Sequence, residues 1–298
     1  MIKLRVPASS ANMGAGFDTL GVALGLYNRI TVEEIPEGLE VINRNTQSFI
    51  PKDTNNLIYR AMIHLFESIG YKPKGYRIEQ NSQIPMTRGL GSSSACIVGG
   101  MLAANIISGR TLSYNEIIHL ASKMEGHPDN VGPALYGGFC VSLTDGDKTI
   151  IKSTKINSDI KFAVIIPDFF VATKKSRGVL PAKVDFRDAV YNISHASMMQ
   201  AAMISGDMDA LRIAVKDKMH QQYRKSYIDG MEDIFNQTYS LGSYATYLSG
   251  SGPTVLSVIS GDSRGFVRGM REYFERNSLR WKCMVLPVDN VGTVVSEI

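Results

Sequence analysis

The sequence predicts an α+β protein made of two units, and three observations lead to this prediction. Helix and strand patterns follow one another without the regular period of a doubly wound parallel sheet. The chain has 298 residues, 44% of them hydrophobic, so it can bury a sizeable core but is long for a single one. The composition becomes more polar between Asp145 and Asp159. We therefore expect one domain at residues 1–150 and a second at residues 151–298.

The charge and the cysteines narrow the class of protein. The formal net charge is only +4, and no run of Lys and Arg alternates with aromatic residues, so we expect no nucleic-acid partner. Three cysteines without a CxxC spacing argue against a disulfide framework or a zinc site and favour a reducing cytoplasm. The first residues lack the apolar segment of a signal peptide. Residues 92–109 are uncharged but short for a bilayer, so we expect a buried helix and no membrane contact.

The first domain is predicted to begin with two strands separated by a loop. Ile2 to Val6 alternates apolar with basic residues, and Pro7 is expected to end this strand. A small-residue loop at 8–16 and a strand at 21–34 follow. Thr54 is a candidate N-cap for a helix that Gly70 ends at the C′ position. The remaining expected elements are a strand at 76–79, helices at 95–108 and 113–124 (the second opened by a capping box of Ser113 and Glu116), a strand at 136–143 and a hairpin turn at 145–147.

The second domain is predicted from apolar strand patterns that alternate with amphipathic helices. Strands are expected at 162–166, 244–248, 254–259 and 282–286. Helices are expected at 186–203, 208–216, 231–240 and 264–276.

The most informative segment is a glycine- and serine-rich loop at the start of a predicted helix. It runs from Pro85 to Ala95 and contains Gly89, Gly91 and three consecutive serines. A helix N-terminus presents free N–H groups and a partial positive charge, which together bind phosphate. Glycines let the backbone approach an anion without a Cβ clash. No Gly-Lys dipeptide occurs, so this is not a Walker P-loop, and close helix packing is the structural alternative.

Two further loops share this composition. Residues 7–18 place Asn12 and Asp18 on either side of a glycine-containing turn, so both side chains could face one cleft. Residues 248–254 contain a Gly-Ser-Gly turn between two predicted strands. Taken singly, the first loop is better explained as an Asx-stabilised loop and the second as a hairpin turn. The presence of all three in one chain favours a functional role.

These segments resemble, in the same order and spacing, the three motifs of the GHMP kinases, the class of galacto-, homoserine, mevalonate and phosphomevalonate kinases. The resemblance covers essentially the whole chain. It implies an N-terminal domain like the second domain of ribosomal protein S5, a ferredoxin-like C-terminal domain and an active site between them. It also implies ATP and Mg²⁺ as cofactors, with the loop from Pro85 to Ala95 at the phosphates.

Within this family the sequence is most similar to the homoserine kinases. The similarity lies in residues 7–18, 125–131 and 173–181 and in the isolated Arg224. It implies an amino-acid substrate, with a carboxylate at its ammonium group and arginines forked onto its carboxylate. The substrate residues implied in this way are Asn12, Asp18, His127, Thr173, Arg177, Arg224 and Gly252.

The same resemblance implies the nucleotide and metal residues. Ser93 and Glu125 are the implied magnesium ligands, in keeping with the preference of Mg²⁺ for one or two protein oxygens. The implied catalytic residues are Ser93, Glu125 and Asn130. Asn130 stands where mevalonate kinases carry an aspartate near this turn, and we do not expect the neighbouring Asp129 to be a general base. The nucleotide residues are Asn56 at the base, and Pro85, Gly89, Leu90, Gly91, Ser92, Ser93, Ser94 and Ala95 at the phosphates.

The expected reaction is transfer of the γ-phosphoryl group of ATP to the hydroxyl of L-homoserine, which belongs to threonine biosynthesis. One alternative is a GHMP kinase for another alcohol, such as a sugar or mevalonate. A second is a non-catalytic regulator with the same fold. A serine hydrolase is a third, although the chain lacks a GxSxG elbow. The strand Ile2 to Val6 would suit pairing across a homodimer.

Overall fold

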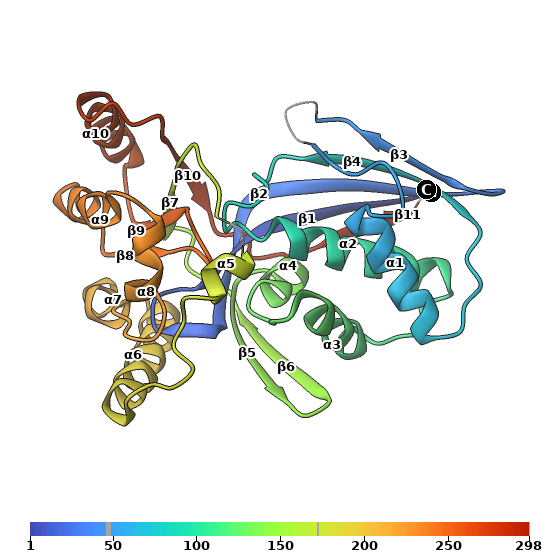
Figure 1. The fold of residues 1–298 in the computed structure, drawn as a ribbon, viewed down its shortest axis with the longest axis horizontal. Helices are drawn as coiled ribbons and strands as arrows, with labels where there is room; N and C mark the ends of the chain where they lie inside the picture. Colours follow the sequence, from blue (N-terminus) through green and yellow to red (C-terminus); the bar gives the residue numbers. More distant parts are fainter. Residues whose placement is uncertain (46–48, 172, 298) are drawn as a thin grey trace.

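The computed structural model describes residues 1–45, 49–171 and 173–297, and contains two β-sheets with helices packed against each (Figure 1). The seven-stranded sheet has the order β11-β1-β2-β4-β3, and β5 and β6 join it through β2. The four-stranded sheet has the order β10-β7-β9-β8 and is antiparallel throughout. The predicted α+β class is confirmed.

The larger sheet is organised around one long antiparallel pair, β1 and β2. Its helices α1 (Leu57–Ser68), α2 (Ser92–Ile107), α3 (Tyr114–Glu125) and α4 (Val131–Tyr136) lie together on one side of it in Figure 1. Its strands are β1 (Ile2–Asn12), β2 (Gly16–Ile35), β3 (Leu39–Asn43), β4 (Gly75–Ser82), β5 (Phe139–Asp145), β6 (Lys148–Thr154) and β11 (Val294–Glu297).

β1 is longer than predicted because Pro7 does not end it. Its register with β2 shifts between Pro7 and Ala8, and such an irregularity tolerates a residue that lacks a backbone N–H. The segment predicted as a loop at 8–16 is therefore mostly strand. β1 is also flanked by β11 on one side and β2 on the other. The expected pairing of Ile2–Val6 across a dimer is thus wrong, because both edges of β1 are occupied within the chain.

The N-cap of helix α1 lies two residues later than predicted. The side-chain oxygen of Asn56 accepts hydrogen bonds from the backbone N–H groups of Ile58 and Tyr59, at 3.0 and 3.2 Å. Asn56, and not Thr54, is therefore the N-cap. Gly70 follows the last turn with φ 68°, as expected of a residue at C′.

Helix α2 begins earlier than predicted, at Ser92 instead of Ala95. Gly91, in the left-handed region at φ 67°, turns the chain into the helix there. All three serines of the loop therefore belong to the first turn. The capping box of Ser113 and Glu116 at the start of α3 is confirmed.

The smaller sheet has its strands in the order fourth, first, third, second, which is the order of a ferredoxin-like β-α-β-β-α-β unit. Along β7, Ala163 and Ile165 face the core under α9 and α10, and Phe162 and Val164 face the core under α6 and α7. Its elements are β7 (Lys161–Ile166), α5 (Thr173–Arg177), α6 (Phe186–Ser205), α7 (Met208–Ala214), α8 (Gln221–Arg224), α9 (Met231–Ser240), β8 (Ala245–Leu248), β9 (Val255–Ile259), α10 (Ser263–Arg276) and β10 (Lys282–Pro287).

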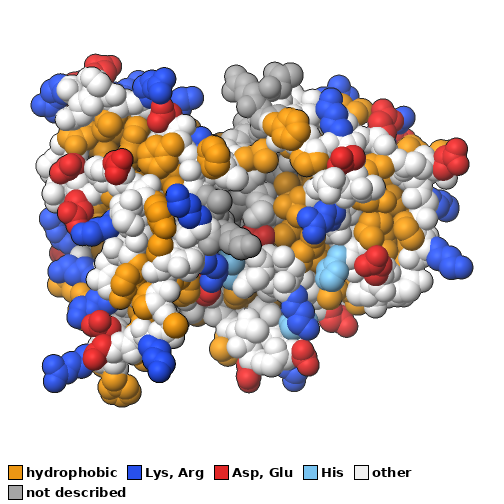
Figure 2. Space-filling model, in the orientation of Figure 1, with side chains coloured by type: hydrophobic (Ala, Val, Ile, Leu, Met, Phe, Trp, Pro, Cys, Tyr) orange, Lys and Arg blue, Asp and Glu red, His pale blue; other side chains and the backbone are white. Residues whose placement is uncertain are grey.

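The two units are not strictly consecutive in sequence. The division expected between residues 150 and 151 falls inside β6, and β11, after the second unit, returns to pair with β1. On the face shown in Figure 2, acidic and basic side chains lie interspersed over both units. None of the helices in the described ranges combines the length and the apolar character needed to cross a membrane.

Candidate active site

The N-terminus of α2 opens into a cavity, and the turn before it requires its glycines. Gly89 and Gly91 both have positive φ, 76° and 67°. A Cβ at Gly89 would lie 2.2 Å from the carbonyl oxygen of Ser249, and one at Gly91 would lie 1.9 Å from Oγ of Ser9. No described side chain caps α2, so its first N–H groups remain for a ligand. This geometry supports a phosphate site formed by the backbone.

The three glycine-rich loops, distant in sequence, meet around this turn. The hydroxyl of Ser249 donates to the carbonyl oxygen of Gly89 at 2.5 Å, and it lies 2.8 Å from the hydroxyl of Ser10. The backbone N–H of Gly250 donates to the carbonyl oxygen of Ala11 at 3.1 Å. Small residues recur in all three loops because the three backbones approach this closely.

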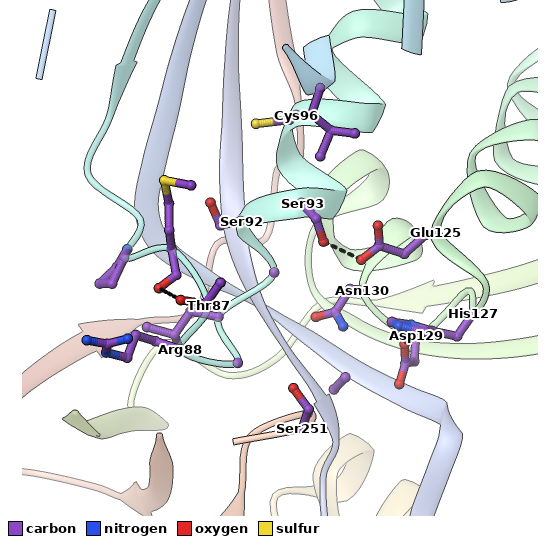
Figure 3. A pocket seen from close by; sticks show the side chains of 18 of the residues that line it. Thr87, Arg88, Ser92, Ser93, Cys96, Glu125, His127, Asp129, Asn130 and Ser251 are labelled. Carbon is purple, nitrogen blue, oxygen red and sulfur yellow. Dashed lines mark hydrogen bonds and ion pairs between the residues drawn. The ribbon is translucent and has the colours of Figure 1, made fainter. Parts of the chain in front are cut away.

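The cavity is lined by residues of both units. Figure 3 shows Ser93 and Glu125 pointing toward one another, with Asn130, His127 and Asp129 on the same side of the cavity. Predicted site residues that line it are Asn12, Asp18, Asn56, Pro85, Gly89, Leu90, Gly91, Ser92, Ser93, Glu125, His127, Asn130, Arg177 and Arg224.

A carboxylate and two hydroxyls converge at the start of α2. Ser93 donates a hydrogen bond to Oε1 of Glu125 at 2.5 Å, and Ser94 donates to the same oxygen at 3.0 Å. Glu125 is the last residue of α3, where the helix dipole disfavours a negative charge. The nearby N-terminus of α2 offsets this. Hard oxygen donors beside a phosphate-binding turn are the set that Mg²⁺ accepts, so Glu125 and Ser93 fit the metal implied by the sequence.

Asp18 and Arg177 form a two-pronged ion pair elsewhere in the cavity. The two N–O distances are 2.7 and 3.0 Å. The backbone N–H of Asp18 donates to Oδ1 of Asn12 at 3.0 Å, and Nδ2 of Asn12 donates to the carbonyl oxygen of Gly250 at 2.9 Å. Asn12 thus joins the first loop to the third. An anion and a cation side by side suit a ligand that carries both an ammonium and a carboxylate group.

Arg224 is a buried cation at the cavity wall, with 2% of its surface exposed. Its guanidinium donates to the carbonyl oxygens of Ser176 at 3.3 Å and Gly250 at 2.9 Å, and to Nδ1 of His220 at 3.2 Å. Burial, followed by the positive charge of Arg177, lowers the pKa of Arg224 to about 10. Because these three bonding partners are neutral, the guanidinium remains available to an anionic ligand.

His220 holds Arg224 in place from below the cavity. Its Nε2 donates to the carbonyl oxygen of Gly14 at 2.7 Å, so Nδ1, which accepts from Arg224, carries no proton. Burial lowers the pKa of His220 against the opposing charge of Asp217, and the ring stays neutral. Asp217 is itself fixed by the amide of Asn192 and by the backbone N–H groups of Met219, His220 and Gln221.

His127 is paired with Asp129, at 2.6 Å between Nδ1 and Oδ1. Burial acts to lower the pKa of His127, but the bond to Asp129 and the charges of Asp129, Glu125 and Asp18 outweigh burial and raise it. Asn130 accepts a hydrogen bond from Oγ of Ser9 at 2.8 Å. An amide cannot take up a proton at neutral pH, so Asn130 can position a ligand but cannot act as a base.

Several predicted residues do not reach the cavity. Ser94 and Ala95 are fully buried in the first turn of α2, and neither lines the cavity. Gly252 lies near the side chains of Leu248 and Ile228 and also does not line it. In the same loop, Gly250 and Ser251 line the cavity.

Two other predicted residues, Asn56 and Thr173, differ from those that face the cavity with a free side chain. Asn56 lines the cavity, but its oxygen caps α1 and its amide nitrogen donates to the carbonyl oxygen of Pro51 at 3.1 Å. The side chain of Thr173 lies outside the described part of the structure.

Three further residues near the charged groups of the cavity were not predicted from the sequence. The ring of Phe17 lies 5.4 Å from the guanidinium of Arg177 and 5.3 Å from that of Arg224. Arg88 lines the cavity, and burial lowers its pKa. Phe17 and Arg88 could have been predicted from the sequence, because Phe17 directly precedes Asp18 and Arg88 is the one cation of its loop. His220 was not predicted because the carbonyl oxygen of Gly14, which fixes its ring, comes from a distant segment. Its other partners, Asp217 and Arg224, are only three and four residues away.

Comparison with known proteins agrees with this geometry. Family models described as the GHMP kinases N terminal domain and the GHMP kinases C terminal match residues 56–138 and 199–276. A homoserine kinase of Clostridium beijerinckii is 45% identical over 298 residues, covering 100% of this chain and 99% of the relative. A homoserine kinase of Clostridium botulinum is 43% identical over 297 residues, with coverage of 100% and 99%.

Solved structures give the same grouping. A crystal structure of homoserine kinase from Cytophaga hutchinsonii superimposes with a TM-score of 0.87 at 25% identity, covering 99% of this chain and 97% of that one. Mevalonate kinase from Methanococcus jannaschii shares the fold, with a TM-score of 0.70 at 14% identity and coverage of 96% and 98%. The chain therefore belongs to the GHMP kinase family, alongside the homoserine kinases.

Proposed function

We propose that this chain transfers the γ-phosphoryl group of ATP to the side-chain hydroxyl of L-homoserine, giving O-phospho-L-homoserine for threonine biosynthesis. One observation carries the proposal: a phosphate-binding helix end and a charge set suited to an amino acid share one cavity. The first is the turn from Gly89 to Ser93, and the second is Asp18 with Arg177 and Arg224. The relatives named homoserine kinase support the same acceptor.

The residues of the chain act mainly by holding the two substrates in register. In the proposed complex, Asp18 binds the ammonium group of homoserine, and Arg177 and Arg224 bind its carboxylate. The hydroxyl end of the substrate then extends toward α2. The N–H groups at the start of α2 and the hydroxyls of Ser92 and Ser93 hold the phosphates. Arg177 and Asp18 pair with each other in this structure, and binding exchanges that pair for two contacts with the zwitterion.

Magnesium is part of the proposal. When bound with ATP, Mg²⁺ neutralises charge on the transferring phosphates. Glu125 and Ser93 would hold it, since their oxygens already converge beside the phosphate turn. Ser94 would keep the carboxylate of Glu125 oriented from behind.

The proposed mechanism does not depend on a general base. Phosphoryl transfer has a loose transition state in which positioning and charge stabilisation supply most of the catalysis. Asp129 is engaged with His127, and Asn130 cannot accept a proton. We therefore assign both to positioning. His127, with its raised pKa, can donate a hydrogen bond to the substrate.

The test is an ATP-consumption assay of the purified chain with homoserine, mevalonate, galactose and shikimate as acceptors. Homoserine should give the highest kcat/KM. Preference for mevalonate or galactose would keep the kinase class and overturn the acceptor. No turnover with any acceptor, together with measurable ATP binding, would favour a non-catalytic regulator of the same fold.

We propose a cytoplasmic location because of the three cysteine thiols. Cys96, Cys140 and Cys283 are all free and buried. Burial raises the pKa of each to about 12, so none is a ready nucleophile. Free cysteines of this kind suit a reducing compartment.

A further inference from the structure

The guanidinium of Arg224 is held on one edge by three acceptors of the chain itself. Its Nε donates to the carbonyl oxygen of Ser176 at 3.3 Å. Its Nη1 donates to the carbonyl oxygen of Gly250 at 2.9 Å and to Nδ1 of His220 at 3.2 Å. Nη2 makes no hydrogen bond with the part of the chain that the structure describes. The two N–H groups on Nη2 are therefore the ones left for a ligand.

His220 is the one side chain among these acceptors, and its ring is fixed on the opposite side by the first loop. Nε2 lies 2.7 Å from the carbonyl oxygen of Gly14, which can only accept, so Nε2 carries the ring proton. The lone pair of Nδ1 then faces Arg224. Gly14 itself cannot move toward the second unit, because a Cβ there would lie 2.1 Å from the carbonyl oxygen of Val215. The first loop thus sets the ring orientation.

The backbone that carries His220 and Arg224 is fixed by a buried carboxylate. Asp217 accepts from the backbone N–H groups of His220 at 2.9 Å and Gln221 at 2.7 Å, at the start of α8. Its other oxygen accepts from Nδ2 of Asn192, on α6, at 2.7 Å. His220 and Arg224 are four residues apart, so one turn of helix brings their side chains together. Neither Asp217 nor His220 is among the described residues that line the cavity.

A neutral acceptor has an advantage over a carboxylate at this position. The charges of Asp18 and Asp129 act on Arg224 from nearby. A direct ion pair with either would neutralise the guanidinium and compete with the carboxylate of a ligand. The imidazole of His220 fixes the orientation of Arg224 and leaves its positive charge unpaired.

We propose that His220 is a positioning residue for the acceptor, and that its unprotonated Nδ1 keeps Nη2 of Arg224 available to the carboxylate of homoserine. The proposal rests on the proposed function, since it assumes an acceptor that carries a carboxylate. His220 acts only through Arg224, so it should affect the KM for homoserine. The phosphate turn at the start of α2 should not respond to it.

Steady-state kinetics of the unmodified protein, His220→Leu and His220→Gln test the proposal. His220→Leu removes the acceptor at similar volume and should raise the KM for homoserine about tenfold, with the KM for ATP changed by less than about twofold. Gln carries a carbonyl acceptor and an amide donor at about the reach of the imidazole. His220→Gln should therefore keep the KM for homoserine within about threefold of that of the unmodified protein.

Thr238→Val is the matched control for loss of a buried hydrogen bond in the same unit. Thr238 is fully buried, its hydroxyl lies 2.7 Å from that of Thr246, and it is not among the lining residues described for the cavity. Both KM values should be unchanged in this variant.

A double-mutant cycle shows whether His220 acts through Arg224. Arg224→Ala alone should raise the KM for homoserine more than His220→Leu does. Adding His220→Leu to Arg224→Ala should then change this KM by less than about twofold.

NMR of the unmodified protein with ¹⁵N-labelled histidine gives a readout that does not require a folded His220→Leu variant. The ring of His220, assigned by its absence in His220→Gln, should be neutral and protonated at Nε2 at about pH 7.5. A ring protonated at Nδ1 cannot accept a hydrogen bond from Arg224 and would overturn the proposal.

Three kinetic results would also overturn it: equal rises in the KM for homoserine and for ATP in His220→Leu, additive effects of His220→Leu and Arg224→Ala, or a His220→Gln variant as impaired as His220→Leu. Each of these leaves homoserine as the preferred acceptor and rejects only the role of His220. An unmodified protein that phosphorylates mevalonate or galactose but not homoserine would instead overturn the proposed function, and the positioning role with it.

Discussion

At the scale of single residues, the site depends on close backbone contacts that permit no side chain. Gly89 approaches the carbonyl oxygen of Ser249. Gly91 packs against Ser9, which in turn holds Asn130. Substitutions here act on the shape of the phosphate turn before they act on any functional group.

Gly89→Ala should lower kcat/KM for ATP by more than about tenfold, a change of at least about 1.4 kcal/mol. The new Cβ would meet a backbone carbonyl at 2.2 Å, and φ at this position is 76°, so the turn must move away from the third loop. Steady-state kinetics would measure the effect. The control is Gly146→Ala, because Gly146 also has positive φ, 54°, but has nothing within 4 Å. Equal losses in both variants would mean that backbone conformation alone, and not the close contact, matters.

Arg177→Ala should raise the KM for homoserine about 10- to 100-fold, as expected for the loss of about 1.4 to 2.8 kcal/mol from a charged hydrogen bond. Its side chain is partly exposed, so truncation leaves no buried group unpaired. The KM for ATP should stay near normal. Arg276→Ala on α10 serves as a control for loss of a positive charge. A similar rise in both KM values would remove Arg177 from the acceptor site.

At the scale of elements, each helix near the site has one end that either caps the helix or positions a residue at the cavity. α1 is capped by Asn56, α2 begins at the phosphate turn, and α3 ends at Glu125. α8 ends at Arg224, which His220 braces from the residue before the helix. Substitution of the capping residue Asn56 should therefore affect mainly stability, whereas substitution of Glu125 or Arg224 should affect mainly activity.

Asn56→Ala should lower the free energy of unfolding by about 0.5 to 2 kcal/mol, because it removes the acceptor for two N–H groups of α1. Asn56→Asp should retain most of the stability, since a carboxylate caps a helix equally well. Urea denaturation of the two variants measures the difference. If Asp is as destabilising as Ala, the bond from Asn56 to the carbonyl of Pro51 outweighs the cap.

His220→Gln should make the free energy of unfolding fall less steeply as the pH is lowered. In the folded chain the pKa of His220 lies below its usual 6.5, so at falling pH the unfolded chain binds a proton before the folded one does. Its contribution is present above about pH 6.5 and is lost as the pH falls toward the folded pKa, by at most about 1.4 kcal/mol per pH unit. Asp217 opposes the shift and Arg224 strengthens it.

Urea unfolding at pH 7.5 and at lower pH, compared between the unmodified protein and His220→Gln, measures this contribution. Other groups, His127 among them, titrate in both proteins and cancel in the difference. An identical pH dependence in the two proteins would contradict a neutral, buried His220.

At the scale of the whole molecule, three loops join the two units around one cavity, so ligand binding in one unit should stabilise the other. The single tryptophan, Trp281, lies in the core of the second unit, whereas the phosphate turn belongs to the first. ATP at 100 times its Kd should raise the free energy of unfolding reported by Trp281 fluorescence by about 2.7 kcal/mol. Far-UV circular dichroism should follow the same transition.

Ser249→Ala provides the control for this coupling, because it removes the hydroxyl that contacts Gly89 and Ser10. In that variant, ATP should raise the free energy of unfolding reported by Trp281 fluorescence by less than it does in the unmodified protein. A tryptophan signal that ATP leaves unchanged in the unmodified protein would mean that the two units unfold independently.

Local signals were sufficient for much of this architecture. The capping box of Ser113 and Glu116 and the C′ position of Gly70 follow from interactions within a few residues. The lining residues Asp18, Arg177 and Arg224 came from a family resemblance, since no local pattern places distant charges in one cavity.

The features that could not be predicted from the sequence depend on contacts between distant segments. The continuation of β1 past Pro7 is stabilised by pairing with β2, which outweighs the local effect of proline. The strands β3 and β11 are short and were not predicted, because their partners, β4 and β1, define them. Gly252 was assigned to the substrate by its motif and does not line the cavity; a Cβ there would meet the side chains of Leu248 and Ile228.

The return of β11 to β1 has a consequence for synthesis on the ribosome. Ile2 to Arg5 pair with Val294 to Glu297, so β1 is made long before its partner β11. At about 5 to 20 residues per second, roughly 15 to 60 s separate them. Throughout that interval the nascent first sheet carries an open edge at β1, and only pairing with β11 closes it.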